Sequence, residues 1–206
     1  MSGSGATSDG GSASGGGSAD VYLVRHGETA WSITGQHTGR TDLVLTARGE
    51  EQARAVGPRL KGLHFDHVFS SPLQRARRTC ELAGFAGAAT LDPDLYEWDY
   101  GQYEGRTLVE IHRERPEWEI FRDGCPGGES VLQITERADR VVSRVRALKG
   151  NVLLFSSGHI LRVLAARWIE GAAEIGRRLA LDPTGICLLG YEHGGLDSVI
   201  RLWNDH

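Results

Sequence analysis

The stretch VYLVRHGETA, residues 21–30, decides how the rest of the chain is interpreted. Its first four residues, Val21 to Val24, form a short apolar run that predicts a buried strand. Arg25 and His26 follow directly, and Gly27 then permits a tight turn. A second apolar run, in LLFSSGHILR (residues 153–162), likewise ends on serines, a glycine and a histidine. Polar side chains therefore follow the ends of two predicted strands that are distant in the sequence.

Predicted strands alternate with predicted helices along the rest of the chain. This alternation indicates an α/β fold of three layers, in which helices flank a mostly parallel central sheet. Residues 105–128 are less regular and predict a small loop-rich insertion. Further strands are expected at 65–71, 151–157, 185–192 and 199–203, and helices at 46–60, 71–84, 130–148 and 160–170. The residues TLVE, 107–110, match a capping box that opens a further short helix.

The first 19 residues differ in composition from the rest, because nearly all of them are Gly, Ser or Ala. Such residues cannot bury a core, so we expect a flexible tail over 1–19. The tail has neither the basic start nor the apolar stretch of a signal peptide. Residues 20–206 predict one domain. No apolar run approaches the roughly 20 residues that span a bilayer, so no membrane partner is expected.

Charge and cysteine content narrow the functional classes further. The formal net charge of -4 gives no basic field to attract nucleic acid, so nucleic acid is not expected as a partner. Cys80, Cys125 and Cys187 form an odd, widely spaced set, which fits reduced thiols in the cytoplasm better than disulfides or a zinc site. We therefore expect a cytoplasmic protein. The sequence leaves a homodimer open.

Cationic side chains gather where the carboxyl ends of the predicted strands meet. Ligands of α/β sheets bind at this edge. The helix over 71–84 is expected to begin with Ser71 as its N-cap and Pro72 at its first position. Arg75 then lies in the first turn, where free backbone N–H groups favour an anion. Together with Arg25 and His26, it predicts a phosphate pocket that contains a nucleophile.

Four motifs carry a resemblance to a known family: LVRHGETAW, SSPLQRARRT, LYEWDYGQYEG and SSGHILRV. They resemble the motifs of the histidine phosphatase superfamily, also called phosphoglycerate mutase-like, over residues 21 to about 205. Within it, the chain is most similar to a microbial branch of sugar-bisphosphate phosphatases and broad acid phosphatases. The resemblance implies a phosphomonoesterase that needs neither metal nor cofactor. Its substrate would be a small phosphorylated metabolite, such as a sugar phosphate, hydrolysed through a phosphohistidine.

The resemblance also assigns roles to individual residues. His26 resembles the nucleophile, Arg25 and Arg75 resemble its phosphate clamps, and Glu97 resembles the general acid that protonates the leaving oxygen. This chemistry is coherent, since an imidazole attacks phosphorus while cationic donors hold the phosphoryl oxygens. The positions at which relatives contact substrate are Ser32, Thr38, Gly39, Gly158 and His159.

One position departs from the family pattern Ser-His-Gly-x-x-x-Arg. The register set by Ser156, Gly158 and Arg162 places Ser157 where the second catalytic histidine should stand. His159 lies two residues later, about 6.6 Å along an extended chain, and cannot simply take its place. Two interpretations stay open: a phosphatase of reduced activity, or a phosphate-binding protein without turnover.

Phosphoglycerate mutase activity is a further alternative within the family. It is disfavoured because mutases of the family carry an arginine directly after the acid, where this chain has Trp98. They also carry a longer, more basic insertion. Trp118, Phe121 and Arg122 of the insertion are candidates for specificity determinants, while packing of the two aromatic side chains in the core is an equal alternative.

Overall fold

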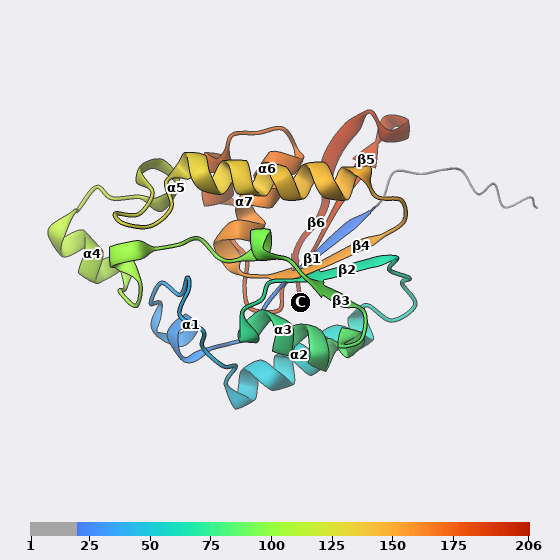
Figure 1. Cartoon of the computed structure of the whole chain (residues 1–206), viewed down its shortest axis with the longest axis horizontal. Coiled ribbons are helices and arrows are strands. Elements are labelled where there is room, and N and C mark those ends of the chain that lie inside the picture. The colour runs from blue at the N-terminus through green and yellow to red at the C-terminus, as the bar shows by residue number, and fades with distance from the viewer. Residues whose placement is uncertain (1–19) are drawn as a thin grey trace, which may run out of the picture.

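A computed structural model describes residues 20–206; the predicted tail over 1–19 lies outside the described residues. The fold centres on a six-stranded sheet in the order β3-β2-β4-β1-β5-β6. The predicted three-layer α/β architecture is confirmed (Figure 1). The strands are β1 (Val21–Arg25), β2 (His67–Ser70), β3 (Ala89–Leu91), β4 (Val152–Ser156), β5 (Ile186–Glu192) and β6 (Asp197–Asp205).

Strand β1 lies in the interior of the sheet, and its register sets the position of the site. It pairs in parallel with β4, which places Arg25 opposite Ser156. β2 also pairs in parallel with β4, so Ser70 lies beside Phe155. β5 and β6 run antiparallel to their neighbours, so the sheet is mostly but not wholly parallel. The carboxyl ends of β1, β2 and β4 therefore meet at one edge.

Helices cover both faces of the sheet (Figure 1). Because successive strand residues point to opposite faces, Leu23 and Leu154 enter the core under α6 and α7, whereas Val24 and Phe155 enter the core over α2. Strands buried on both faces explain the continuous apolar runs of the sequence. The helices are α1 (Ala30–Thr34), α2 (Ala47–Arg59), α3 (Gln74–Cys80), α4 (Leu108–Glu114), α5 (Ile120–Asp123), α6 (Val131–Ala147) and α7 (Gly158–Trp168).

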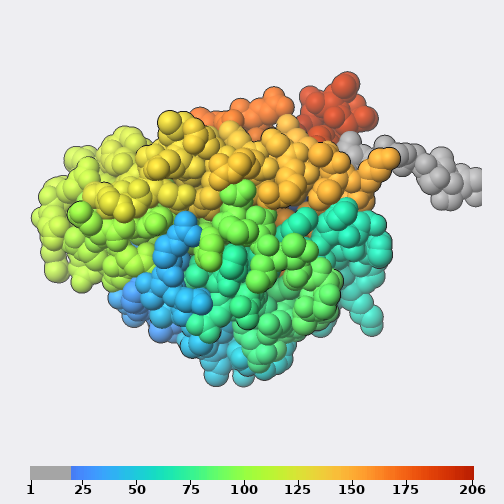
Figure 2. All heavy atoms as spheres, in the orientation of Figure 1, coloured from blue at the N-terminus to red at the C-terminus, as the bar shows by residue number. Residues whose placement is uncertain are grey.

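The predicted insertion over 105–128 contains the two short helices α4 and α5. Thr107 and Glu110 form the predicted capping box at the start of α4. In the space-filling view, the blue segment around α1 lies against the yellow-green insertion (Figure 2). An isolated bridge between Gln36 and Thr107 links the loop after α1 to the insertion. The insertion thus borders the segment that follows the first strand.

The start of α3 differs from the prediction. The helix begins at Gln74 with Leu73 as its N-cap, and no side chain of its own caps it. Ser71 instead extends the sheet edge, since its N–H donates to the carbonyl of Phe155 at 2.9 Å. The N–H of Gln74 donates to the carboxylate of Asp42 at 2.8 Å. A carboxylate distant in sequence therefore takes the capping role that was expected of Ser71.

The three cysteines are free and buried. Burial raises the pKa of each thiol, Cys80, Cys125 and Cys187, to about 12. Between residues 20 and 206, no helix combines the length and the apolar character needed to cross a bilayer.

Candidate active site

His26 leaves β1 in a geometry that suits a nucleophile. Its backbone N–H donates to the carbonyl of Ser156 at 2.8 Å, which continues the pairing with β4 by one residue. Its Nδ1 lies 2.7 Å from its neighbour's carbonyl oxygen, that of Gly27. A carbonyl only accepts, so Nδ1 carries the proton and Nε2 keeps its lone pair. Burial, and then the charges of Arg75 and Arg25, lower the pKa of His26 well below its usual 6.5. The imidazole is therefore neutral.

Main-chain carbonyls fix Arg25 and Arg75, the two cations whose charges act on this histidine. Arg25 donates from Nη1 to the carbonyl of Leu181 at 2.5 Å. Arg75 is fully buried, and the ends of its guanidinium donate to main-chain oxygens between residues 38 and 41 at 2.9–3.0 Å. The Nε of each arginine is buried and has no partner within the described residues. A buried donor without an acceptor is costly, so both groups favour a bound anion.

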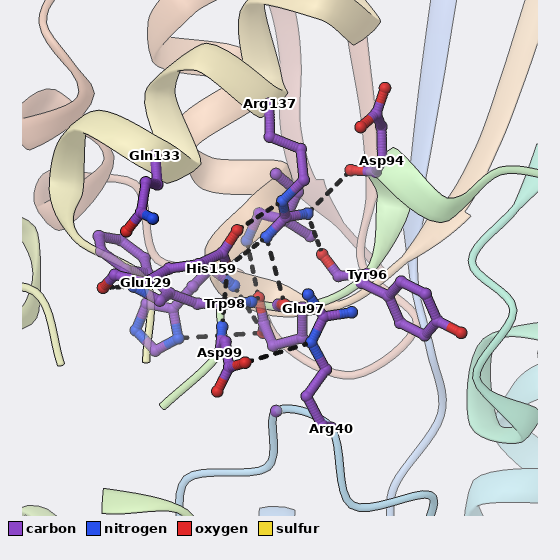
Figure 3. Close-up of polar contacts among 12 residues, drawn as sticks. Arg40, Asp94, Tyr96, Glu97, Trp98, Asp99, Glu129, Gln133, Arg137 and His159 are labelled. Atoms are coloured by element: carbon purple, nitrogen blue, oxygen red, sulfur yellow. Dashed lines mark hydrogen bonds and ion pairs between the residues drawn. The ribbon is translucent and has the colours of Figure 1, made fainter. Parts of the chain in front are cut away.

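Glu97 places its carboxylate at the N-terminus of α7. It accepts hydrogen bonds from the backbone N–H groups of His159 at 2.9 Å and Ile160 at 2.8 Å. A third bond comes from the N–H of Trp98 at 2.9 Å. Figure 3 shows Glu97 between His159 on one side and Arg137 on the other. Glu97 and His26 also line one and the same cavity. The predicted acid and nucleophile therefore share one cavity.

Ser157 is the N-cap residue of α7 but does not cap the helix with its side chain. The N–H groups that a serine would normally bind there are already bonded to Glu97. Ser157 is fully buried, and its Oγ has no partner within the described residues. Its hydroxyl thus joins the Nε groups of Arg25 and Arg75 as the buried polar atoms left unbonded among residues 20–206.

Four of the five predicted substrate contacts line the same cavity of about 190 Å³: Ser32, Thr38, Gly158 and His159. The hydroxyl of Ser32 forms a capping box with Thr29, donating to its carbonyl and accepting from its N–H at 2.9 Å each. Gly39 is not in the lining. Its carbonyl holds Arg75, and its N–H donates to Glu104 at 2.9 Å. A side chain on Gly39 would approach the carbonyl of Trp98 to 2.5 Å, so this glycine permits close backbone packing.

Several cavity residues were not predicted from the sequence. The hydroxyl of Tyr100 lies 2.6 Å from Nδ1 of His159, and burial raises the pKa of this phenol well above 10. His37 donates from Nδ1 to the carbonyl of Arg106 at 2.8 Å, and burial lowers its pKa. Arg162 lines the cavity as a further cation. Tyr100 and Arg162 stand within the quoted motifs, and His37 directly precedes Thr38, one of the predicted substrate contacts.

The proposed specificity residues of the insertion lie outside the cavity lining. Trp118 and Phe121 are buried in the main core, so the core-packing alternative describes their place in the structure. Phe121 packs behind the site, with its ring centre 4.8 Å from the Arg162 guanidinium. Arg122 is exposed and pairs with Asp123. Within residues 20–206, no group of three or more His, Cys, Asp and Glu side chains is arranged to hold a metal ion.

Comparison with known proteins places this geometry in a family. An acid phosphatase of Mycobacterium tuberculosis is 41% identical over 178 residues, covering 84% of this chain and 87% of that protein. A sedoheptulose 1,7-bisphosphatase of Saccharomyces cerevisiae is 37% identical, covering 71% of this chain and 66% of that protein. The solved structure of a putative alpha-ribazole-5'-P phosphatase of Escherichia coli superposes with a TM-score of 0.80 at 28% identity, covering 91% and 97% of the two chains.

A solved structure of an open reading frame from Mycobacterium tuberculosis superposes with a TM-score of 0.84 at 38% identity, covering 90% of this chain and 97% of that one. Residues 21–206 match the sequence profile of the histidine phosphatase superfamily, branch 1. The match includes every residue of the cavity lining, from Arg25 to Leu181. The chain, which places His26 in one cavity with Arg25 and close to the buried Arg75, is a member of the histidine phosphatase superfamily.

Proposed function

We propose that this protein is a metal-independent phosphomonoesterase that hydrolyses a small phosphorylated metabolite, such as a sugar phosphate. The observation that carries the proposal is the neutral His26 near two arginines, Arg25 and Arg75, whose buried Nε groups lack partners among the described residues. Nε2 can attack phosphorus only when it is unprotonated, and the tautomer fixed by Gly27 leaves it so. Relatives named as phosphatases add support, because their names share phosphate-ester hydrolysis while their substrates differ.

The reaction proceeds in two steps. Nε2 of His26 forms a bond to phosphorus while the bond from phosphorus to the ester oxygen breaks, and Glu97 gives its proton to the departing oxygen. Water then attacks the phosphohistidine, Glu97 takes up one of its protons, and inorganic phosphate leaves with the histidine restored. Arg25 and Arg75 stabilise the phosphoryl oxygens throughout.

Two alternatives are separable from this proposal. Mutase activity is disfavoured, because Trp98 stands directly after Glu97, where mutases of the family carry an arginine. Trp98 is fully buried, and its indole N–H donates to the carbonyl of Glu129 at 2.9 Å, so this position offers no cation to a substrate. A phosphate binder without turnover is favoured by a single observation, the buried hydroxyl of Ser157.

The test is hydrolysis of p-nitrophenyl phosphate in EDTA, combined with rapid quench and mass spectrometry of the peptide that contains residues 21–30. We expect acid-labile phosphate on His26 and loss of both turnover and label in His26→Ala. His64→Ala, at an exposed histidine, is the matched control and should behave as the unmodified protein. Phosphate binding without turnover would establish the binder, and a requirement for added metal would overturn the mechanism.

A further inference from the structure

The loop that carries Glu97 has no regular structure of its own. A short 3-10 turn, Pro93–Leu95, precedes it, and residues 96–100 form neither helix nor strand. The backbone of this loop therefore needs partners elsewhere to stay in one conformation. Its carboxylate is held by the N-terminus of α7, but that bond acts only on the side chain.

One guanidinium binds three main-chain carbonyls of this loop. Arg137 of α6 is buried and donates from Nη1 to the carbonyls of Asp94 at 2.8 Å and Tyr96 at 2.5 Å. Its Nη2 donates to the carbonyl of Glu97 itself at 3.3 Å. Figure 3 shows Arg137 reaching from the helix to these oxygens. Arg137 thus fixes the backbone before Glu97 and at Glu97.

Glu129 orients Arg137 and holds the other side of the loop. Its carboxylate accepts from Nε and Nη2 of Arg137 at 2.8 and 2.7 Å, a two-point pairing that fixes the plane of the guanidinium. The same carboxylate accepts from the N–H of Asp99 at 2.9 Å. The backbone N–H of Glu129 donates in turn to the carbonyl of Asp99 at 2.9 Å. Arg137 and Glu129 therefore form hydrogen bonds with the main chain of the loop from residue 94 to residue 99.

A buried ion pair contributes little net stability, because the loss of hydration offsets the attraction between the charges. Positioning explains this ion pair better, because every hydrogen bond that the two side chains form beyond their own pairing goes to the loop of Glu97. We propose that Arg137 and Glu129 are positioning residues for Glu97, and that they hold its carboxylate at the height of the leaving oxygen. This inference rests on the proposed function, in which Glu97 is the general acid.

The test uses the leaving group as its readout. An alkyl phosphate needs a proton on its leaving oxygen, whereas p-nitrophenyl phosphate needs little help. We expect Arg137→Lys to lower kcat on an alkyl phosphate by about 10- to 100-fold, because ammonium lacks the planar fork that spans three carbonyls. The kcat on p-nitrophenyl phosphate should fall less than about threefold, with KM unchanged on both. Glu129→Gln should show the same selectivity, and it preserves the shape of the side chain.

A double-mutant cycle makes the assignment specific. Once Glu97→Gln has removed the acid, Arg137→Lys should cost nothing more on the alkyl phosphate. Asp139→Asn is the matched control, because it breaks the pair between Asp139 of α6 and Arg167 of α7 at 2.7 Å without touching the loop. It should show no preference between the two substrates. Each measurement is also made in Ser157→His, where turnover is expected to be higher.

Four outcomes would overturn the inference. Equal losses on both substrates, or additive losses in the cycle, would mean that the pair serves the general fold. A loss of kcat equal to the unfolded fraction of the variant, measured by circular dichroism at the assay temperature, would also mean that the pair serves the general fold. If Glu97→Gln itself lacks leaving-group selectivity, the general-acid role fails and this inference fails with it. A selective Glu97→Gln with an unselective Arg137→Lys rejects the positioning role alone.

Discussion

At the scale of single residues, Ser157 is the position at which the site is least complete. Its hydroxyl is buried and unbonded because Glu97 binds the N–H groups at the start of α7. A histidine at this position would add a donor that reaches the phosphoryl oxygens, and its charge would complement theirs. The family pattern and the local structure thus point to the same missing group.

We expect Ser157→His to raise kcat on a common substrate by on the order of a hundredfold, since losing one preorganised donor typically costs about 10²–10³-fold. Phosphate affinity, measured by calorimetry, should change less, because Arg25 and Arg75 are present in both proteins. Ser157→Asn fills space without an ionisable ring and serves as the control. An equal or lower rate in the histidine variant would show that residue 157 does not face the phosphoryl group.

At the scale of elements, the helix that carries Arg137 depends on its first turn. Ser130 and Gln133 form a capping box at the start of α6, in which Oγ of Ser130 accepts from the N–H of Gln133 at 3.2 Å and Oε1 of Gln133 accepts from the N–H of Ser130 at 2.8 Å. Helix α6 packs along α7, so fraying of its first turn would expose the core under both helices.

Ser130→Ala should therefore lower the free energy of unfolding by about 1 kcal/mol. The measurement is the urea midpoint followed by circular dichroism, with the denaturant slope expected to stay constant. Ser143→Ala, at an exposed serine in the middle of α6, is the control and should change stability little. If the urea midpoint of Ser130→Ala equals that of the unmodified protein, tertiary packing alone fixes the start of α6.

Long elements with a clear apolar period could be predicted from the sequence, and short or remotely held ones could not. Helix α6 was predicted within a residue or two at each end because Ile134, Val141 and Val145 mark one buried face. The three-residue β3 has mostly exposed side chains and carries no such pattern. The start of α3 depends on Asp42, which no local rule connects to Gln74.

The residues of the site likewise divide into those with a local sequence signal and those placed by remote contacts. Arg25, His26 and Glu97 could be predicted because they stand at fixed places in recognisable motifs, and the structure brings them to one cavity. Gly39 was predicted as a substrate contact, yet it lies outside the cavity lining and its carbonyl accepts a hydrogen bond from Arg75. His37 reaches the cavity through tertiary packing against Tyr100 and Trp118, which the order of residues in the chain does not reveal.

At the scale of the whole molecule, one buried histidine and two partly buried ones, all with lowered pKa values, make folding depend on pH. Burial lowers the pKa of His26 and His159 well below 6.5, and the pKa of His37 below 6.5. The unfolded chain keeps values near 6.5. Below about pH 6.5, the unfolded chain takes up protons that the folded protein does not, so the free energy of unfolding falls as the pH falls.

Urea unfolding at pH 7.5 and pH 5.5 should therefore give a lower free energy at pH 5.5, by up to about 1.4 kcal/mol per pH unit for each such histidine. His159→Gln removes one of the three groups and should flatten this dependence. Val141→Ala lowers stability in the core without removing a titrating group, so its curve should run parallel to that of the unmodified protein. A free energy that stays constant or rises toward pH 5.5 would contradict the buried neutral state.

The strand order has a consequence for how the protein is made. β1 is synthesised first among the strands, but its two neighbours in the sheet are β4 and β5, from the last third of the chain. At about 5–20 residues per second, Arg25 leaves the point of synthesis roughly 7–26 s before Ser156, its partner in register, exists. During that interval β1 is an unpaired apolar strand, open to chaperones and to aggregation. The cavity that contains His26 is therefore among the last parts of the molecule to assemble.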